Sequence, residues 1–443
     1  MDGSKKQILA ENTEVGSYFV SNYPPFSAWT EHSVATITNT ALATKPCEVP
    51  FGMYLHIPFC RKRCHFCYFR VYTDKNANEI QNYLDLLVRE WELYSTQRAI
   101  ANRPIDFVYF GGGTPSFLSV KQLNALVNRL GHSTLWSTAK EITFECEPGT
   151  LTESKLSAIR NLGVTRLSLG IENFDDRVLE INGRAHRSAE VYRAYSYARS
   201  IEFPQINIDL IAGMLGETEE NWKACIEKTL KLSPDSITIY QMELPYNTTI
   251  SDNFLKGTGR FAESVVSWPI KRRWVAEAFE TFERAGYTIG SAYTAVKDPG
   301  ITKFVYRDCL WQGADLVGLG VASFGHIGGV HMQNLDSWSN YARAIGENRL
   351  PLSRAYKLKK EERLIRELVL QLKLGSIQIS YFKNKYNIDI LDRFSKVWTS
   401  LDANGYLIST DNDMIFLSRD GLLRVDSYLP QFFLAEHRNI RYT

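Results

Sequence analysis

The alternation of short apolar runs with amphipathic segments constrains the fold of this chain more than any other feature of its sequence. Between residues 51 and 240, runs that read as strands recur about every 30 residues, with helix-like apolar spacing between them. These strand-like runs are 53–55, 107–110, 141–147, 166–171, 205–213 and 236–240. Because repeated βα units build a parallel sheet covered by helices, we predict an α/β fold with about six such units.

Residues capable of binding or chemistry stand where these predicted strands end. A cysteine-rich loop follows the first strand, and Gly111-Gly-Gly-Thr-Pro115 follows the second. Glu145, Glu172 and Asp209 stand in or just after later strands. Three consecutive glycines let the backbone come close to a ligand. Since ligands of parallel α/β folds bind at the carboxyl ends of the strands, we predict one shared site at this edge of the sheet.

The loop after the first strand carries Cys60, Cys64 and Cys67 in the spacing C-x3-C-x2-C. Three thiolates on one short loop can hold three irons of a [4Fe–4S] cluster and leave the fourth iron open. Radical chemistry through S-adenosylmethionine uses an open iron of this kind. The spacing alone leaves two alternatives, a zinc site with His56 or His65 as the fourth ligand and a purely structural set of thiols.

The composition excludes several classes of protein. The chain has 443 residues, of which 44% are hydrophobic and 23% charged, and its formal net charge is +2, so we do not expect a dedicated nucleic-acid binder. No apolar run reaches the length of about 18 residues that suggests a membrane span, and the polar first residues do not read as a signal peptide. Seven cysteines, three of them in one loop, do not form a secreted disulfide framework, so we predict a cytoplasmic protein.

The length predicts more than one domain. Residues 1–50 read as an N-terminal arm, residues 51–350 as the barrel with an extension, and residues 355–443 as a C-terminal domain. The last of these combines helices with a strand pair around Asp411-Asn-Asp413, which is similar to a winged helix. Because it has no dense basic run, we interpret it as a lid or a substrate-shaping domain and not as a DNA reader.

The arm carries aromatic residues around Pro24-Pro25, a pair that forbids a continuous helix and favours an extended segment. These aromatic residues include Tyr18, Phe19, Tyr23 and Phe26. We predict that the arm lies on the main domain and buries these rings. The alternative is that it covers the active site and touches the substrate.

Two histidines and a carboxamide, His326, His331 and Asn334, lie close together in the sequence. They invite a metal interpretation, but no third strong ligand lies near them. We therefore interpret them as turn residues and hydrogen-bonded histidines.

A series of ordered motifs resembles a known family. The motifs are Tyr54-Leu-His-Ile-Pro-Phe-Cys60, the cysteine loop, Gly111-Gly-Gly-Thr-Pro115, Glu145-Cys-Glu-Pro148, Arg166-Leu-Ser-Leu-Gly-Ile-Glu-Asn-Phe174, Gly183-Arg-Ala-His186 and Asn207-Ile-Asp-Leu-Ile-Ala-Gly213. They resemble the radical SAM enzymes related to oxygen-independent coproporphyrinogen III oxidase, over roughly residues 50–430. The resemblance implies a partial (β/α)6 barrel with a C-terminal helical domain.

The resemblance also implies the cofactors and their residues. Cys60, Cys64 and Cys67 would hold a [4Fe–4S] cluster, and the amino and carboxylate groups of S-adenosylmethionine would chelate its open iron. The residues that would line the S-adenosylmethionine sites are Tyr54, Phe66, Gly112, Gly113, Thr114, Glu145, Arg184 and Asp209, with Glu172 at the position of the family's usual glutamine. A carboxylate such as that of Glu145 can pair with a sulfonium or ammonium group. An electron donor such as flavodoxin or ferredoxin is the implied partner.

The chain departs from its family at three places. Porphyrinogen-oxidising members have one more cysteine after the loop, where this chain has Phe69. The family's usual glutamine is replaced by Glu172. The haem-chaperone branch carries a histidine in a late H-N-x-x-Y-W stretch, whereas the matching region here is Arg307-Asp-Cys-Leu-Trp311.

These departures lead us to place a third branch first, the class C radical SAM methyltransferases. Its members are thought to bind two S-adenosylmethionine molecules and to add a methylene radical, made from the second, to an sp2 carbon. The expected substrate is then a small hydrophobic or aromatic molecule such as the ring of menaquinone, with contact to a membrane surface if it is a quinone. The alternatives are oxidative decarboxylation of coproporphyrinogen III and a haem chaperone.

Overall fold

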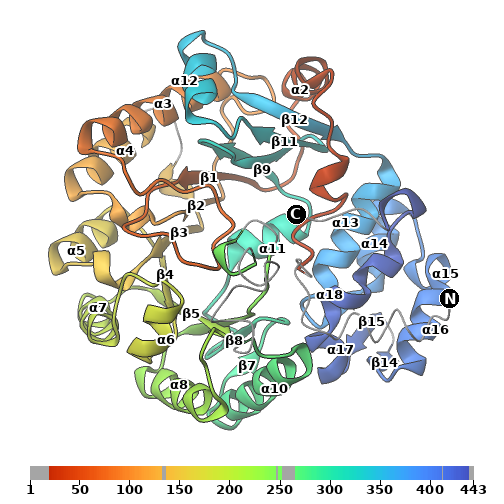
Figure 1. Cartoon of the computed structure of the whole chain (residues 1–443). Coiled ribbons are helices and arrows are strands. Elements are labelled where there is room, and N and C mark those ends of the chain that lie inside the picture. Colours follow the sequence, from red (N-terminus) through yellow and green to blue (C-terminus); the bar gives the residue numbers. More distant parts are fainter. Residues whose placement is uncertain (1–18, 132–135, 246–247, 252–264, 412, 439–443) are drawn as a thin grey trace.

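A twelve-stranded sheet organises the chain (Figure 1). The computed structural model describes residues 19–131, 136–245, 248–251, 265–411 and 413–438. The sheet order is β12-β11-β10-β9-β1-β2-β3-β4-β5-β6-β8-β7. Its parallel centre consists of β1 (Phe51–Ile57), β2 (Phe107–Gly112), β3 (Glu141–Cys146), β4 (Arg166–Glu172), β5 (Gln205–Ala212) and β6 (Ser236–Gln241). This run of parallel strands confirms the predicted α/β partial barrel.

Helices cover the outside of the curved sheet (Figure 1). They are α3 (Ala77–Ser95), α4 (Val120–Gly131), α5 (Glu153–Asn161), α6 (Asp176–Ile181), α7 (Ser188–Ser200), α8 (Glu219–Leu232) and α10 (Trp268–Arg284). Helix α3 shows why the sequence folds this way: Asn76 and Glu79 form a reciprocal capping box at its start. Its residues Ile80, Leu84 and Leu87 are buried at helical spacing, so that one apolar face packs on the sheet.

Both edges of the sheet turn antiparallel. Strand β9 (Asp315–Leu319) is parallel to β1 and is followed by β10 (Phe324–Ile327), β11 (Val330–Asn334) and β12 (Leu352–Lys357), each antiparallel to its neighbour. At the other edge, β8 (Thr294–Val296) pairs antiparallel with β6 and with β7 (Thr288–Ile289). Helices α11 (Val305–Trp311) and α12 (Trp338–Gly346) belong to this extension.

The part of the arm that the structure describes lies between the barrel and the C-terminal residues. Val20, Tyr23 and Trp29 are buried, and α2 (Val34–Leu42) follows. The ring of Tyr23 packs 4.7 Å from that of Phe433, between ring centres. The arm therefore buries the ring of Tyr23, as predicted, whereas Phe19 and Phe26 are half-buried and Tyr18 lies outside the described residues.

The C-terminal residues build a second core of their own around α13 (Lys360–Leu372). The other elements are β13 (Ser376–Gln378), α14 (Ile379–Tyr386), α15 (Ile390–Arg393), α16 (Ser395–Ala403), β14 (Leu407–Asp411), β15 (Met414–Leu417), α17 (Arg419–Leu423) and α18 (Val425–Tyr428). Their small antiparallel sheet has the order β13-β15-β14. Helices combined with such a sheet match the predicted winged-helix-like arrangement.

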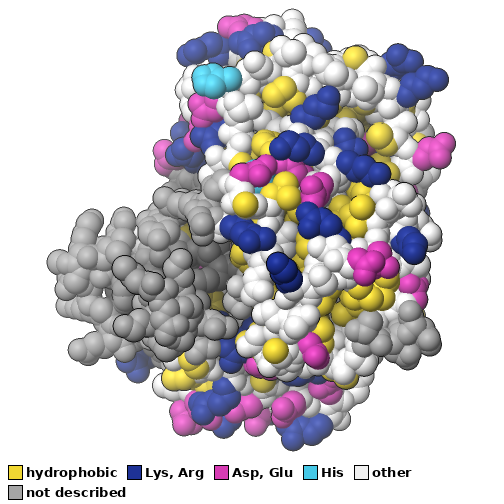
Figure 2. All heavy atoms as spheres, turned by 90° about the vertical axis from the view of Figure 1, so that its right-hand side faces the viewer, with side chains coloured by type: hydrophobic (Ala, Val, Ile, Leu, Met, Phe, Trp, Pro, Cys, Tyr) yellow, Lys and Arg dark blue, Asp and Glu magenta, His cyan; other side chains and the backbone are white. Residues whose placement is uncertain are grey.

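The surface over these C-terminal elements carries basic and acidic side chains interspersed with hydrophobic ones (Figure 2). This mixture gives no single-sign field of the kind that nucleic-acid binders present. Among the residues that the structure describes, no helix combines the length and the apolar character needed to cross a bilayer.

Candidate functional site

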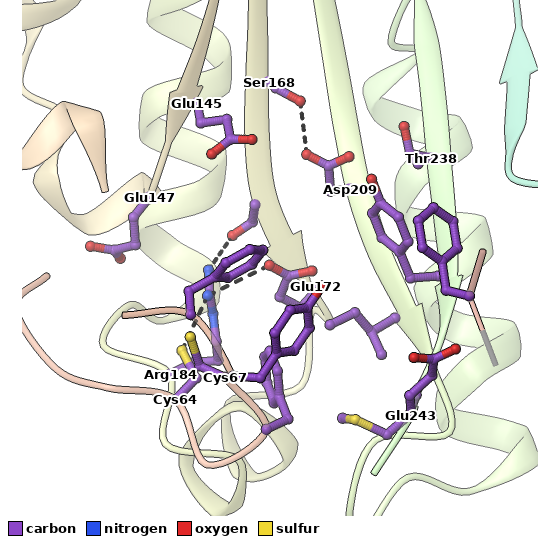
Figure 3. A pocket seen from close by; sticks show the side chains of 18 of the residues that line it. Cys64, Cys67, Glu145, Glu147, Ser168, Glu172, Arg184, Asp209, Thr238 and Glu243 are labelled. Carbon is purple, nitrogen blue, oxygen red and sulfur yellow. Dashed lines mark hydrogen bonds and ion pairs between the residues drawn. The ribbon is translucent and has the colours of Figure 1, made fainter. Parts of the chain in front are cut away.

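A cavity of about 530 Å³ opens at the carboxyl ends of the barrel strands. Eleven of the twelve residues predicted for the cluster and its ligands line it: Cys60, Cys64, Phe66, Cys67, Gly112, Gly113, Thr114, Glu145, Glu172, Arg184 and Asp209. Figure 3 shows how several of these side chains converge from the loop after β1 and from β3, β4 and β5. The shared site predicted from strand-end residues is therefore present as one cavity.

Tyr54 is the predicted residue that the structure keeps out of the cavity wall. It lies on β1 with its ring stacked on that of Tyr109, at 5.8 Å between ring centres. Its hydroxyl lies 3.5 Å from His56 Nδ1. Because Tyr109 and not Tyr54 lines the cavity, Tyr54 supports the wall from behind.

The cysteine loop is closed at its base by the backbone. Tyr72 N donates to Pro58 O at 2.7 Å, and Cys60 N donates to Tyr72 O at 3.1 Å. Further along, His65 N donates to Asn182 O at 3.0 Å. The ring Nδ1 of His65 lies 2.9 Å from Ile181 O. The His65 ring is thus anchored to the helix α6 region through Nδ1.

The spacing of the three thiols separates the cluster from the zinc alternative. A tetrahedral zinc site with Zn–S bonds of about 2.3 Å places its sulfur atoms about 3.8 Å apart. In the described part of the chain, no group of three His, Cys, Asp or Glu ligand atoms that includes these sulfurs lies mutually within 4.8 Å. The cysteines form no disulfides and share one loop, so all three sulfur atoms are available as ligands of a cluster.

Two of the predicted ligand-site residues touch the thiols directly. Thr114 Oγ1 donates to Cys60 Sγ at 3.3 Å, and Arg184 Nη1 donates to Cys64 Sγ at 3.4 Å. Arg184 also donates to Gly170 O at 2.5 Å and lies 3.5 Å from Glu172 Oε1. Burial alone would lower the pKa of Arg184, but its anionic neighbours raise it, so the guanidinium stays charged.

Three carboxylates, Glu145, Glu172 and Asp209, form an acidic group inside the cavity (Figure 3). Burial, with the charge of Asp209, raises the pKa of Glu145 to about 7 against the hydrogen bonds that it accepts from Tyr109 OH (2.6 Å) and Gly112 N (3.2 Å). Burial also raises the pKa of Glu172 to about 7 and that of Asp209. Each carboxylate makes ionisation of the others harder. A cationic ligand would therefore reduce the repulsion between the ionised carboxylates.

The backbone at the end of β4 directs Glu172 into this group. Glu172 has a φ of 65°, in the left-handed region that side chains other than glycine rarely adopt. The register of β4 against β5 shifts between Gly170 and Glu172. Strained backbone of this kind is typical of functional sites, where the surrounding structure maintains it.

The glycine run after β2 owes its composition to packing within the protein. Gly112 has a φ of 110°, and a Cβ on it would meet the His56 ring at 2.6 Å. A Cβ on Gly113 would meet Ile57 O at 2.9 Å. Both residues line the cavity, yet their own neighbours already require glycine. The interpretation that they are glycine for the approach of a ligand therefore stays a prediction.

Arg166 is a cavity residue that the sequence analysis missed as a site residue. Its guanidinium lies 4.0 Å from the centre of the Phe304 ring, and its buried Nε and Nη1 have no hydrogen-bond partner among the described residues. Because β4 is buried on both faces, its apolar pattern does not reveal which side chains point inward. An unpaired buried donor on a cavity wall marks a place where a ligand acceptor would fit.

Glu147 is a second missed residue and holds the cysteine loop to the end of β3. Its carboxylate accepts hydrogen bonds from Arg61 Nε and Nη2, at 3.1 and 3.0 Å, and lies 3.2 Å from His186 Nδ1. Burial would raise the pKa of Glu147, but the contacts with His186 and Arg61 lower it to about 2. The carboxylate is thus ionised throughout the physiological pH range.

The arm and the C-terminal domain complete the far wall of the cavity. Phe19 lines it together with Tyr293 and Asp426. Asp426 joins these parts, because its carboxylate accepts from Val20 N at 2.9 Å and from the Tyr293 hydroxyl and lies 2.7 Å from Lys373 Nζ. Phe19 therefore places the arm at the cavity wall, whereas contact of the arm with the substrate stays a prediction.

Three late residues do not form a metal site. His326 and His331 contact each other, with 3.0 Å between their Nδ1 atoms. Asn334 instead donates to the buried carboxylate of Glu90 at 2.6 Å and to Gly320 O at 2.8 Å. Both histidines are hydrogen-bonded, as predicted, but the prediction of turn residues is wrong, because His326 lies on β10 and His331 and Asn334 lie on β11.

The chain is similar to known proteins over most of its length. The family model described as "Radical SAM superfamily" matches residues 54–229. The oxygen-independent coproporphyrinogen III oxidase of Pseudomonas aeruginosa is 27% identical over 405 residues, covering 86% of this chain and 86% of that protein. The heme chaperone HemW of Bacillus subtilis is 26% identical over 376 residues, covering 84% of this chain and 96% of that protein. The structure of coproporphyrinogen III oxidase from Escherichia coli, a radical SAM enzyme, matches this chain with a TM-score of 0.81. The match covers 94% of this chain and 96% of that one at 23% identity, and it supports the fold.

Proposed function

We propose that this chain, a radical SAM protein related to the oxygen-independent coproporphyrinogen III oxidases, oxidatively decarboxylates a tetrapyrrole bearing propionate groups. Its cofactors are a [4Fe–4S] cluster and S-adenosylmethionine. When bound, they supply a carbon-centred radical able to take a hydrogen atom from an unactivated C–H bond. For each propionate the overall conversion releases one hydrogen atom, one electron and carbon dioxide, leaving a vinyl group. The electron passes to a one-electron carrier of the flavodoxin or ferredoxin class.

The residues of the cavity have distinct roles in this proposal. Cys60, Cys64 and Cys67 hold the cluster. The acidic group of Glu145, Glu172 and Asp209 binds cationic groups, because each S-adenosylmethionine brings a sulfonium and a molecule that does not chelate the iron also brings an ammonium. Three carboxylates in one cavity suit two such molecules better than one.

Basic side chains on the cavity wall outside the acidic group are the observation that carries the choice of substrate. Lys62 and Arg63 come from the cysteine loop, Arg272 from α10, and Arg424 from the turn between α17 and α18. A substrate with several carboxylates needs cations around it, whereas an uncharged quinone ring does not. Arg424 is also paired with Asp420 at 2.8 Å, so Lys62, Arg63 and Arg272 are the cations that favour a propionate-bearing tetrapyrrole over menaquinone.

A flat apolar body also has a surface to pack on. Tyr68 and Phe69 line the cavity, are 41% and 46% exposed, and have ring centres 4.5 Å apart. Phe19, Tyr293 and Trp268 line it as well. Exposed aromatic rings on a cavity wall are the side chains expected to stack on a planar ligand.

Methyl transfer to an sp2 carbon is the second candidate, and Phe69 is the observation in its favour. This phenylalanine stands on the cavity wall where the porphyrinogen-oxidising members of the family have a cysteine. The aromatic surface that would receive a tetrapyrrole would equally receive another flat acceptor. The class C reaction therefore stays a proposal beside decarboxylation.

Product analysis under anaerobic conditions tests these alternatives. The reconstituted protein is incubated with S-adenosylmethionine, a reductant and coproporphyrinogen III. We expect a vinyl-bearing product, carbon dioxide, 5′-deoxyadenosine and methionine. Formation of S-adenosylhomocysteine with a methylated acceptor would establish the second candidate. Tight haem binding without cleavage of S-adenosylmethionine would instead identify a haem chaperone and refute both reactions.

A further inference from the structure

A second cavity, of about 360 Å³, lies between the edge of the barrel sheet and the C-terminal helices. It shares no lining residue with the central cavity. Its walls come from the loop before β1, from β9 and the turn joining β10 to β11, and from α13 and α14. Its size is within the range of small-molecule sites.

The carboxylates that line this cavity are already engaged. Asp315 Oδ2 accepts from Arg103 Nη1 at 2.7 Å, and Asp315 Oδ1 accepts from Gly328 N at 2.9 Å. The Glu367 carboxylate lies 2.9 Å from Lys385 Nζ and accepts from Tyr381 OH at 2.6 Å. The charges of both carboxylates favour the charged form of Arg366, but neither forms an ion pair with it.

Three further cations line the same cavity from one face of α13. Lys360, Arg363 and Arg366 are spaced three residues apart, so their side chains lie next to one another on the helix. Within the part of the chain that the structure describes, none of them has a carboxylate within ion-pair distance. Like charges gathered in this way repel one another unless an anion lies among them.

Arg366 is the strongest sign that a ligand belongs here. Its exposed fraction is 5%, and its one hydrogen bond to a described residue runs from Nε to Asn22 Oδ1 at 2.8 Å. A guanidinium has five N–H donors, so four of them have no partner among the described residues. Burial lowers the pKa of Arg366, because removing the charged guanidinium from water costs free energy.

A pair of histidines adds an acceptor to this basic wall. His331 Nε2 lies 3.0 Å from Tyr23 O, and because a carbonyl can only accept, Nε2 carries the hydrogen. Burial lowers the pKa of His331 to about 3 and that of His326 well below its usual value, so both rings are neutral. The Nδ1 of His331 must then accept from the Nδ1–H of His326, 3.0 Å away. The remaining nitrogen of His326, Nε2, is a hydrogen-bond acceptor on a residue that lines the cavity.

We propose that this cavity binds an oxyanion that keeps a hydrogen, namely inorganic hydrogenphosphate. The cations of α13 bind its charged oxygens, and Arg366 offers paired donors to two of them. The acceptor nitrogen of His326 receives the remaining O–H. Sulfate has the same shape but no hydrogen at neutral pH, so the same acceptor disfavours it.

Thermal unfolding of the anaerobically reconstituted protein tests the proposal. Inorganic phosphate should raise the unfolding temperature, and sodium sulfate or chloride at the same ionic strength should raise it less. The double variant Lys360→Gln/Arg363→Gln removes two cavity cations that are solvent-exposed, so folding should be retained. We expect its apparent affinity for phosphate to fall by at least about ten-fold, the loss expected for one charge-assisted contact.

The matched control is Lys383→Gln/Lys396→Gln, which makes the same charge change on exposed residues of α14 and α16 that do not line the cavity. This control should respond to phosphate as the native protein does. An equal loss of response in both double variants, or an equal effect of sulfate and phosphate on the native protein, would show a general salt effect and overturn the proposal.

Cys47 gives a local readout at the same cavity. Its thiol is exposed and the residue lines the cavity, so bound phosphate should slow alkylation of the peptide that contains it. The protection should disappear in Lys360→Gln/Arg363→Gln and persist in the control. Alkylation at an unchanged rate in saturating phosphate would place the phosphate elsewhere and contradict the assignment.

Discussion

Arg184 Nη1 donates a hydrogen bond to Cys64 Sγ at 3.4 Å, although 120 residues separate the two in sequence. The same guanidinium lies 3.5 Å from Glu172. One side chain thus joins the cysteine loop to the acidic group of the cavity. The two parts of the site, one for the cluster and one for cationic ligands, are held in a common geometry by this contact.

Removal of a cluster ligand should abolish the cofactor site. In Cys64→Ala, we expect loss of the open-iron cluster and of all S-adenosylmethionine cleavage, because two cysteines cannot hold a stable [4Fe–4S] centre in this loop. Iron and sulfide analysis of anaerobically purified protein measures the effect. Cys309→Ala, outside the loop, is the control and should keep its iron. Unchanged iron and sulfide in Cys64→Ala, or zinc in their place, would contradict the assignment of a [4Fe–4S] cluster to this loop.

Replacement of Glu145 should weaken the binding of S-adenosylmethionine and spare the cluster. Glu145→Ala removes a carboxylate from the acidic group, and the loss of a charge-assisted hydrogen bond costs about 1.5–3 kcal/mol. Calorimetric titration gives the affinity, and iron analysis gives the occupancy. Glu153→Ala, on the outer helix α5, is the matched control. A variant that lost its iron but bound S-adenosylmethionine normally would make Glu145 a structural residue.

The pH dependence of that affinity follows from the pKa of Glu145, which burial raises to about 7 in the ligand-free cavity. Below this value the carboxyl is protonated and cannot pair with a cation. The affinity for S-adenosylmethionine should therefore increase as the pH rises through about 7, and Glu145→Gln should reduce the increase. Titrations on both sides of this pH measure it. An equal slope in the native protein and the variant would contradict the role of Glu145.

The same raised pKa has a consequence for folding. The unfolded chain releases this proton at its ordinary value of 4.5, whereas the folded chain keeps it until about 7. Between these pH values the folded state binds more protons, so its free energy of unfolding falls as the pH rises. Unfolding curves of the ligand-free protein should show a smaller fall in Glu145→Gln than in the native chain. A fall of the same size in both would assign it to other buried carboxyls.

Neutralising one of the basic side chains on the cavity wall should weaken the binding of a propionate-bearing substrate. Lys62 lines the cavity and is exposed, so Lys62→Gln should leave the fold and the iron content intact. We expect a several-fold higher KM for coproporphyrinogen III, with a weaker dependence on salt, because one screened charge contact is lost. Lys121→Gln on α4 is the control. If both variants had the native KM, the basic side chains on the cavity wall would not select the substrate by charge.

Isotope transfer distinguishes the two candidate reactions. With S-adenosylmethionine deuterated in its methyl group, decarboxylation takes hydrogen from the substrate, and the 5′-deoxyadenosine should contain no deuterium. Methyl transfer through a second S-adenosylmethionine would move one deuterium into it. Mass spectrometry of 5′-deoxyadenosine formed during turnover decides, and deuterium found there would return the methyltransferase to first place.

Much of the cofactor site could be predicted from local sequence. The C-x3-C-x2-C spacing, the glycine run and the strand-end carboxylates are short-range patterns, and the alternation of strands and helices brings them to one edge of the sheet. The hypothesis of methyl transfer to a quinone rested on single replacements such as Phe69. These do not reveal the surrounding charge, which depends on residues from α10 and the C-terminal domain.

The sequence by itself determined the parallel α/β order and the three cysteines, because backbone periodicity and ligand spacing are local properties. Only the tertiary structure decided that Tyr54 stands behind Tyr109, that Glu172 turns inward from a strained backbone, and that Arg166 faces the cavity. It also brought Asn22 to Arg366, 344 residues away, at the wall of a second cavity. Such contacts depend on how the arm, the barrel and the C-terminal domain pack together, and packing between distant segments leaves no periodic signal in the chain.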